Sequence, residues 1–357
     1  MATVDSGTFI NHKALGEWAK NIFMKVGVSA SDADIITESL IAANLRGVDT
    51  HGVTRMMGVY VKRIRLGLMN PVPQFEIVRE KASTALIDCH NSIGQLGAHF
   101  AMQKAIEKAK KTGTSFVVTS HSNHYGAAAY WTMMALRHGM IGFSSVNAPA
   151  AVAPTGGCEP MFGTNPFAVA VPAGNDIPFV LDMATTLVAR GRIILYAKQG
   201  KELQPGWAFD AQGRPTTDPN VALKGLLAPM GGYKGYGIAF AVDILSGILT
   251  GSSFGKHFPG MLAENLKDPT DVGGVFAAID IESFMDLKEF TARMEQAFAE
   301  VRGCARAEGV DRIYTPGEIE HDTTKERLQS GIPLPKEIHK EYVALGEELG
   351  VPFPAAM

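Results

Sequence analysis

Apolar side chains recur every three or four positions in the first 70 residues, which predicts helices. The first expected helix has one apolar face, formed by Leu15, Trp18, Ala19, Ile22 and Phe23. The apolar face of the second is formed by Ile36, Leu40 and Ala43. Ser31 is a candidate N-cap of this second helix, and Gly47 is the expected stop after it. The pattern therefore predicts a helical beginning to the fold.

From about residue 75 the chain changes to short apolar runs between Gly-rich turns, a pattern typical of buried strands alternating with helices. The expected strands are 83–88, 115–120, 140–147, 167–173, 178–183 and 275–281. The expected helices are 95–111, 127–137, 287–302 and a long apolar one that follows 231–237. This alternation predicts an α/β fold.

The last segment, from about residue 320, is polar and then helical over 335–349. We hypothesise that it packs back on the N-terminal helices. One discontinuous helical domain (1–75 with 320–357) would then adjoin an α/β domain (76–319), with PVPQ at 71–74 near the boundary.

Composition narrows the function classes. The chain has 357 residues, 46% of them hydrophobic, and a net charge of −3 with acids and bases interspersed. No concentrated basic face indicates a nucleic-acid partner. We expect no membrane association, because no signal-peptide stretch and no apolar run of about 18 residues occurs. The three cysteines are far apart in the chain and form no C-x-x-C pair, which favours a soluble protein of the reducing cytoplasm.

Several familiar motifs are missing. No G-x-G-x-x-G follows a strand, and GGYKGYG (231–237) has the wrong glycine spacing for a Rossmann fingerprint. A P-loop, a G-x-S-x-G elbow and an H-E-x-x-H helix are also missing. The residues alone therefore establish no nucleotide site, and they count against a serine hydrolase or a zinc protease.

The first polar constellation is Asp49-Thr50-His51-Gly52, with Arg55 close behind. A histidine moves protons well at neutral pH, and an arginine can hold a carboxylate through two hydrogen bonds. The alternative is a surface turn whose histidine is satisfied locally.

The second constellation is HSNHYG (121–126), directly after a predicted strand. Residues at such a strand end often face the ligand crevice of α/β proteins. Three interpretations stay open: an acid/base histidine, a structural turn, or a metal pair of His121 and His124 that lacks an identified third ligand.

Three further features could build a pocket. The Pro- and Gly-rich stretch 146–169 suggests an ordered loop around a ligand, or an interface arm. Glycines of GGYKGYG allow a ligand to approach the backbone, with Lys234 offering charge to a phosphate; a tight turn with a solvated lysine is the alternative. Asp182 could hold a ribose, orient a histidine, or cap a helix.

Together these segments resemble the malate/L-lactate dehydrogenase family, which also contains ureidoglycolate and sulfolactate dehydrogenases. The matching strings are RGVDTHGVTR (46–55), SNHYG (122–126), APTGGCEPMFGTNP (153–166), LDMATT (181–186), GWAFDAQGRPTTDP (206–219), GGYKGYG (231–237) and DILSGILTG (243–251). They occur in order over some 200 residues, so the resemblance is specific.

The resemblance implies a non-Rossmann, sulfolactate-dehydrogenase-like α/β fold that binds NAD or NADP, with a helical domain made from both termini. It also implies a homodimer whose cofactor cleft involves both subunits. His124 matches the acid/base position, His51 matches a proton-transfer histidine of some members, and Arg55 matches a substrate-carboxylate contact. The implied cofactor positions are Ala148, Asp182, Met183, Ala184, Lys234, Pro316, Gly317 and Glu318.

Two departures from the family pattern bear on these roles. Thr50 stands where relatives often have Ser before the histidine, and its hydroxyl preserves a relay role. Ala148 stands where relatives can have Ser, so a contact there must be through the backbone or water.

The resemblance favours malate/oxaloacetate as the substrate pair, with Arg190 and Arg192 as candidate partners of the distal carboxylate. L-lactate, ureidoglycolate, sulfolactate, a diketo sugar acid and a cyclic imino acid remain alternatives. Two other classes are also open: a metal-dependent lyase using His121 and His124, and a ligand-binding relative without turnover.

Overall fold

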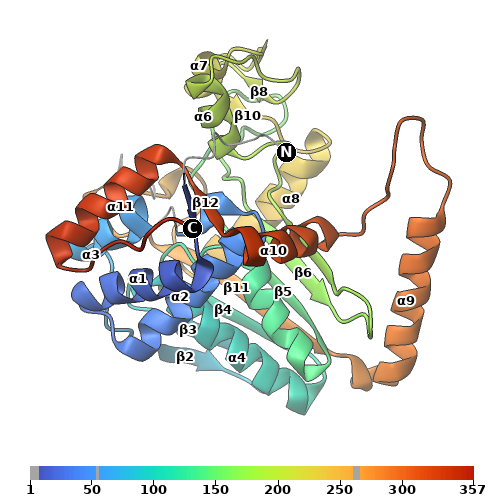
Figure 1. The fold of residues 1–357 in the computed structure, drawn as a ribbon. Coiled ribbons are helices and arrows are strands. Elements are labelled where there is room, and N and C mark those ends of the chain that lie inside the picture. The colour runs from blue at the N-terminus through green and yellow to red at the C-terminus, as the bar shows by residue number, and fades with distance from the viewer. Residues whose placement is uncertain (1–7, 54–55, 260–265) are drawn as a thin grey trace.

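The computed structural model describes residues 8–53, 56–259 and 266–357 (Figure 1). At its centre lies a seven-stranded mixed sheet of order β2-β3-β4-β11-β5-β6-β7. In that order the strands are Glu76–Glu80, Thr84–Asp88, Phe116–Ser122, Val272–Asp280, Met140–Val146, Phe167–Val171 and Phe179–Met183. The β3–β4 pair is parallel, and the other neighbouring pairs are antiparallel. Each expected apolar run is a strand of this sheet, which confirms the α/β prediction.

Two helices pack on the sheet where the site forms. α4 (Gly94–Thr112) lies on β4 and β11, and α5 (Ala128–Thr132) lies on β5 and β6. The α4 side chains in the core against the sheet include four alanines at positions 98, 101, 105 and 109, and these small side chains let the helix approach the strands closely. This packing holds the loop between β4 and α5 in place.

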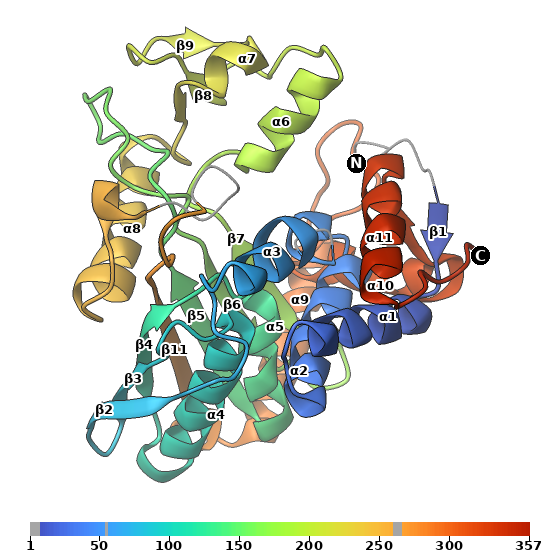
Figure 2. The same cartoon turned by 90° about the vertical axis from the view of Figure 1, so that its left-hand side faces the viewer.

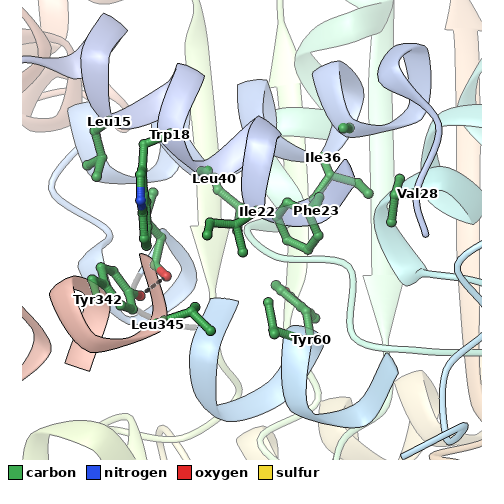
Figure 3. Close-up of a cluster of buried hydrophobic side chains, with 14 of the residues drawn as sticks. Leu15, Trp18, Ile22, Phe23, Val28, Ile36, Leu40, Tyr60, Tyr342 and Leu345 are labelled. Atoms are coloured by element: carbon green, nitrogen blue, oxygen red, sulfur yellow. Dashed lines mark hydrogen bonds between the residues drawn. The ribbon is translucent and has the colours of Figure 1, made fainter. Parts of the chain in front are cut away.

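Both ends of the chain share one core (Figure 3). α1 (His12–Lys25) and α2 (Ala30–Leu45) pack with α11 (Lys336–Leu349), and β1 (Thr8–Ile10) pairs with β12 (Ile332–Leu334). The indole Nε1–H of Trp18 donates to the carbonyl oxygen of Val351 at 3.0 Å. These contacts support the discontinuous helical domain, whose bounds stay a prediction.

A small lobe stands apart from the seven-stranded sheet (Figure 2). Its elements are α6 (Arg190–Lys198), β8 (Ala208–Phe209), β9 (Pro215–Thr216), α7 (Pro219–Ala222) and β10 (Leu226–Leu227). Ile193 and Leu227 of the lobe belong to a small core that also includes Val152 and Phe162 of the stretch before β6. The apolar pattern did not predict the lobe, because its strands are only two residues long.

Other expectations need correction. Ser29, not Ser31, caps α2: its Oγ accepts from the backbone N–H of Asp32 at 3.2 Å. The expected helix 127–137 is α5 followed by a 3₁₀ segment, Met133–His138, and the apolar helix is α8 (Tyr233–Asp243) continued by a π-helical turn, Ile244–Ile248.

The helices near the C-terminus complete the fold. The polar stretch after residue 320 is itself helical, as part of α10 (Glu318–Ser330). The expected helix 287–302 is α9 (Leu287–Gly303), which stands apart from the other helices in Figure 1.

Candidate active site

A cavity of about 370 Å³ opens between the ends of β4, β5 and β7, the 3₁₀ turn Asp49–His51 and the start of α6. Its lining includes Thr50, His51, His124, Asn147, Ala148, Asp182, Met183 and Ala184. Alanines 127–129 add to a largely apolar wall. Such a wall with a few convergent polar groups is typical of a small-molecule site.

His124 is positioned by a tightly bonded turn after β4. The side-chain amide of Asn123 donates to the carbonyl oxygens of Asn91 and Ser92, at 3.1 and 2.9 Å. Gly94, at the start of α4, lies directly beneath: a Cβ built there would be 2.3 Å from the carbonyl oxygen of His124. Only a glycine at position 94 lets α4 come this close to the turn, and this close contact holds the turn so that His124 lines the cavity.

Two groups of the described residues lie within hydrogen-bonding distance of His124 Nδ1. The Tyr60 hydroxyl lies 2.7 Å from it, and the backbone N–H of Gly126 donates to it at 3.2 Å. Tyr60 belongs to a π-helical segment, Met56–Val61, and its ring is fully buried in the N-terminal core. Sequence reasoning missed this contact, because Tyr60 looks like one more apolar core position.

His51 faces the same cavity. Its ring lies 5.5 Å from the ring of His124, centroid to centroid, at an interplanar angle of 24°. The Thr50 hydroxyl lies 2.9 Å from His51 Nδ1. Asp49, which begins this turn, forms an ion pair with Arg327 at 2.6 Å. The structure thus brings both predicted histidines together.

Asp182 marks another part of the cavity. It is open to the cavity but otherwise surrounded by protein, and this burial raises the pKa of its carboxyl group against the opposing effects of the Ala129 N–H and Arg46. Its Oδ2 accepts from the Ala129 N–H at 2.8 Å. Asp182 therefore accepts a hydrogen bond from α5. It does not cap a helix of its own segment, because the next helix along the chain, α6, begins only at Arg190.

Arg46 and Glu320 also line the cavity and were missed as site residues. Burial lowers the pKa of Arg46, while Glu320 and Asp182 oppose that effect. Within the described residues the Arg46 guanidinium has no hydrogen bond. Arg46 stands at the start of the string 46–55, but that string alone gives no sign that it meets Glu320 of α10.

Other predicted cofactor positions lie away from this cavity. Lys234 is exposed in the first turn of α8. The carbonyl oxygen of Pro316 accepts a hydrogen bond from the N–H of Val180 at 3.0 Å. Because Val180 lines the cavity, the loop that contains Pro316 lies behind the cavity wall. Glu318 is buried in ion pairs with Arg302 and Arg312. Arg55 lies outside the described residues.

His121 does not join His124. It lines a second cavity, and its Nδ1 lies 2.9 Å from Asp88 Oδ2. Over the part of the chain that the structure describes, no three His, Cys, Asp or Glu side chains are grouped to hold a metal ion. The two histidines line different cavities, so the described residues do not support the metal-pair interpretation.

The two candidate arginines for a distal carboxylate also separate. Arg190, together with Ala189 and Gly191, lines the cavity at the N-terminus of α6, whereas Arg192 does not line it. The first turn of α6 has no side-chain cap. Its free N–H groups favour an anion at this end of the cavity.

Comparison with known proteins identifies the family of the chain. A model of the malate/L-lactate dehydrogenase family matches residues 10–342. The chain belongs to this family. It is 40% identical over 338 residues to the malate dehydrogenase of Pyrococcus abyssi, covering 92% of each protein. It is 38% identical over 331 residues to the L-sulfolactate dehydrogenase of Methanocaldococcus jannaschii, covering 93% of this chain and 94% of that protein.

Solved structures of the same fold support this family membership. The malate dehydrogenase structure from Entamoeba histolytica matches with a TM-score of 0.93 at 35% identity, covering 98% of this chain and 100% of that one. The protein is therefore an oxidoreductase of the malate/L-lactate dehydrogenase family, and the family implies a nicotinamide cofactor. Within residues 8–53, 56–259 and 266–357, no helix combines the length and apolar character needed to cross a bilayer.

Proposed function

We propose that the protein interconverts malate and oxaloacetate with a nicotinamide cofactor. The observation that carries the proposal is the pair of histidines, His51 and His124, whose rings stack at 5.5 Å in one apolar cavity. Such a pair can bind the oxygen on C2 of the substrate and exchange its proton. The similarity to malate dehydrogenases supports the substrate class.

The residues of the cavity fit the cofactor. Asp182 and Glu320 can accept hydrogen bonds from ribose hydroxyls, and the Arg46 guanidinium can face an anionic group. Ala148, Met183 and Ala184 offer backbone groups beside an apolar wall. When bound, the nicotinamide ring supplies or accepts the hydride. The chain's own part is to orient the substrate, keep water out and handle the proton.

Two cations would hold the substrate. Arg55 is proposed to bind the C1 carboxylate, as the family resemblance implies. Arg190 is proposed to bind the distal carboxylate, supported by its position at the uncapped start of α6. A sulfonate in place of that carboxylate meets the same chemistry, so sulfolactate is the second candidate substrate, supported by the 38% identity to a sulfolactate dehydrogenase.

A spectrophotometric assay tests the proposal. NADH or NADPH is mixed with oxaloacetate, sulfopyruvate, pyruvate or a cyclic imino acid, and reduced nicotinamide is followed by absorbance. We expect oxaloacetate to give kcat/KM at least about 100-fold above pyruvate, which lacks the distal anion. The comparison of NADH with NADPH also identifies the cofactor. Turnover confined to pyruvate or to the imine would refute the malate assignment.

We propose that two copies of the chain form a dimer through α8 and the turn after it. Between residues 235 and 255 the sequence has Asp243 as its one charged residue, and that side chain is buried. Ile238, Ile244 and Ile248 are exposed on this apolar surface. Lys234 lies on the same helix, which supports the predicted sharing of the cofactor cleft.

Light scattering during gel filtration tests the dimer. Ile244→Glu should give a monomer, because it places a charge in an apolar interface. Val301→Glu on α9 is the control, since Val301 is similarly exposed but lies elsewhere. A monomeric wild-type protein, or an unchanged dimer with Ile244→Glu, would exclude this interface.

A reducing, cytoplasmic setting is also proposed. Cys89, Cys158 and Cys304 are free thiols, and burial raises the pKa of Cys89 to about 12. Unpaired cysteines are usual in reducing compartments. Cell fractionation followed by immunodetection of the protein tests this setting.

A further inference from the structure

We infer that the two histidines have different tasks: His124 is a neutral hydrogen-bond donor to the substrate oxygen, and His51 carries the proton. Tyr60 is then a positioning residue that fixes the tautomer of His124. The inference rests on the proposed function for its substrate, but its structural part concerns the protein alone.

The backbone N–H of Gly126 decides the tautomer. A peptide N–H can only donate, and it points at Nδ1 of His124 from 3.2 Å. Nδ1 must therefore carry a lone pair rather than a proton. In the neutral imidazole the proton then resides on Nε2. An imidazolium, with protons on both nitrogens, would set two N–H groups against each other.

Tyr60 adds a second donor to the same nitrogen. Because Nδ1 has no proton to give, the Tyr60 hydroxyl donates across the 2.7 Å separation. The Tyr60 ring is fully buried, and it packs with Phe23 at 6.4 Å between centroids, within the core of Figure 3. The core thus holds the phenol where it bonds His124, so protonation of Nδ1 would cost two hydrogen bonds.

A neutral imidazole held in this way uses Nδ1 to accept from the protein, so toward the substrate it can only donate, through Nε2–H. Its Nε2–H can bond the C2 oxygen of either the keto acid or the hydroxy acid. Such a donor, fixed before the reaction, stabilises the negative charge that develops on that oxygen. A neutral histidine that polarises a carbonyl is a known catalytic arrangement. His124 is therefore assigned to charge stabilisation, in place of the acid/base role that the family resemblance implies for it.

Proton transfer is then assigned to His51. Its Nδ1 partner is the Thr50 hydroxyl, at 2.9 Å, and a hydroxyl can either donate or accept. His51 can accordingly be neutral or protonated without losing this bond. In reduction, the C2 carbonyl gains the hydride at carbon, its π electrons form an O–H bond, and the proton comes from protonated His51. Oxidation reverses these steps, and neutral His51 receives the hydroxyl proton.

Nitrogen-15 NMR of histidine-labelled, full-length enzyme tests the tautomer without any substrate. The His124 signals are assigned by their loss in His124→Gln. We expect a non-protonated Nδ1 and a protonated Nε2 at pH 7, with no imidazolium form of His124 between pH 6 and pH 8. A proton on Nδ1 of His124 would overturn the inference, whether or not the proposed substrate is turned over.

Substitutions of the histidines test the division of tasks. Glutamine keeps a neutral donor, so His124→Gln should retain at least about tenfold more kcat than His124→Leu. His51→Gln should lose about 100-fold or more of kcat, because glutamine cannot carry a proton. Equal losses in the two His124 variants, or near-normal turnover of His51→Gln, contradict the assignment.

Tyr60 has a matched control in the same core. Tyr60→Phe should shift the Nδ1 resonance of His124 and lower kcat about tenfold, while NADH affinity stays within about twofold. Tyr342 is also fully buried, and its hydroxyl donates to the Val53 carbonyl oxygen, so Tyr342→Phe removes a core hydroxyl without touching His124. If both variants leave the Nδ1 resonance unchanged, Tyr60 is not the positioning residue.

Discussion

Arg327 forms a two-pronged ion pair with Asp49, 278 residues away in sequence, with Nη1–Oδ1 and Nη2–Oδ2 distances of 2.6 and 3.0 Å. The same guanidinium donates to the carbonyl oxygen of Asn44, whose own side-chain amide bonds Asp49 at 2.7 Å. Arg327 comes from α10 near the C-terminus, and Asp49 stands two residues before His51. The C-terminal part of the chain thus fixes the turn that presents a proposed catalytic histidine.

Loss of the Arg327–Asp49 ion pair should lower both the stability of the fold and the turnover of the enzyme. Arg327→Ala removes the two-pronged ion pair with the partly buried Asp49 carboxylate, so we expect a cost of about 1–3 kcal/mol in the free energy of unfolding. Turnover should fall about tenfold, because the turn carrying His51 loosens. Arg327→Lys should lie between, since lysine lacks the two-pronged geometry. Denaturant unfolding and steady-state kinetics measure these effects; wild-type kcat in Arg327→Ala would show that α10 does not position His51.

Arg190 should decide between substrates with and without a distal anion. Arg190→Gln removes the charge at the start of α6, so KM for oxaloacetate should rise about tenfold or more. KM for pyruvate, which lacks the distal carboxylate, should change less than about threefold. Arg192→Gln is the matched control, because Arg192 lies two residues away on the same helix and does not line the cavity. Equal effects of the two variants on oxaloacetate would remove Arg190 from the substrate site.

The sheet could be predicted from sequence because its strands bury apolar runs of five or more residues. β5 and β6 are examples, each bounded by turn residues. The small lobe could not, because two-residue strands such as β8 and β9 carry no periodicity. The cap of α2 was displaced by two residues, since Ser29 and Ser31 are equally good capping types and only the backbone distinguishes them.

The sequence predicted some residues of the candidate site and missed others. His51 and His124 follow recognisable turns, and the structure brings them into one cavity. Tyr60, Arg46 and Glu320 gave no signal, because their relevance depends on contacts between elements far apart in the chain. Local chemistry identifies which side chains could act, whereas tertiary packing decides which of them meet.

Gly94 should tolerate no side chain. The Cβ of an alanine there would lie 2.2 Å from the Asn123 carbonyl oxygen and 2.3 Å from that of His124, so the turn that carries His124 must move. We expect Gly94→Ala to cost about 1–3 kcal/mol of stability and at least about tenfold in kcat. Gly303→Ala is the control, because a Cβ added there, at the end of α9, would have no atom of the described residues within 4 Å. Normal turnover in Gly94→Ala would mean that the turn can shift without consequence.

Glu318 should make the protein sensitive to acid. Burial would raise the pKa of Glu318, but the Thr315 N–H and the Arg312 guanidinium prevail and lower it from 4.5 to about 2. A carboxyl group whose pKa falls on folding stabilises the fold above its unfolded pKa, and that contribution disappears as the pH drops from about 4.5 to about 2.

Glu318→Gln removes this contribution, so its melting temperature should be several degrees below wild type at pH 7, where loss of a charged hydrogen-bonded partner costs about 1–3 kcal/mol. The gap should narrow below about pH 4.5, because Glu318 of the wild type then takes up a proton in the unfolded state but not yet in the folded state. Glu289→Gln on α9 is the control, since its ion pair with Arg293, at 3.7 Å, is exposed and contributes little. Thermal melts from pH 7 to pH 3 measure both variants. A gap that stays constant over this range would show that the Glu318 charge does not stabilise the fold.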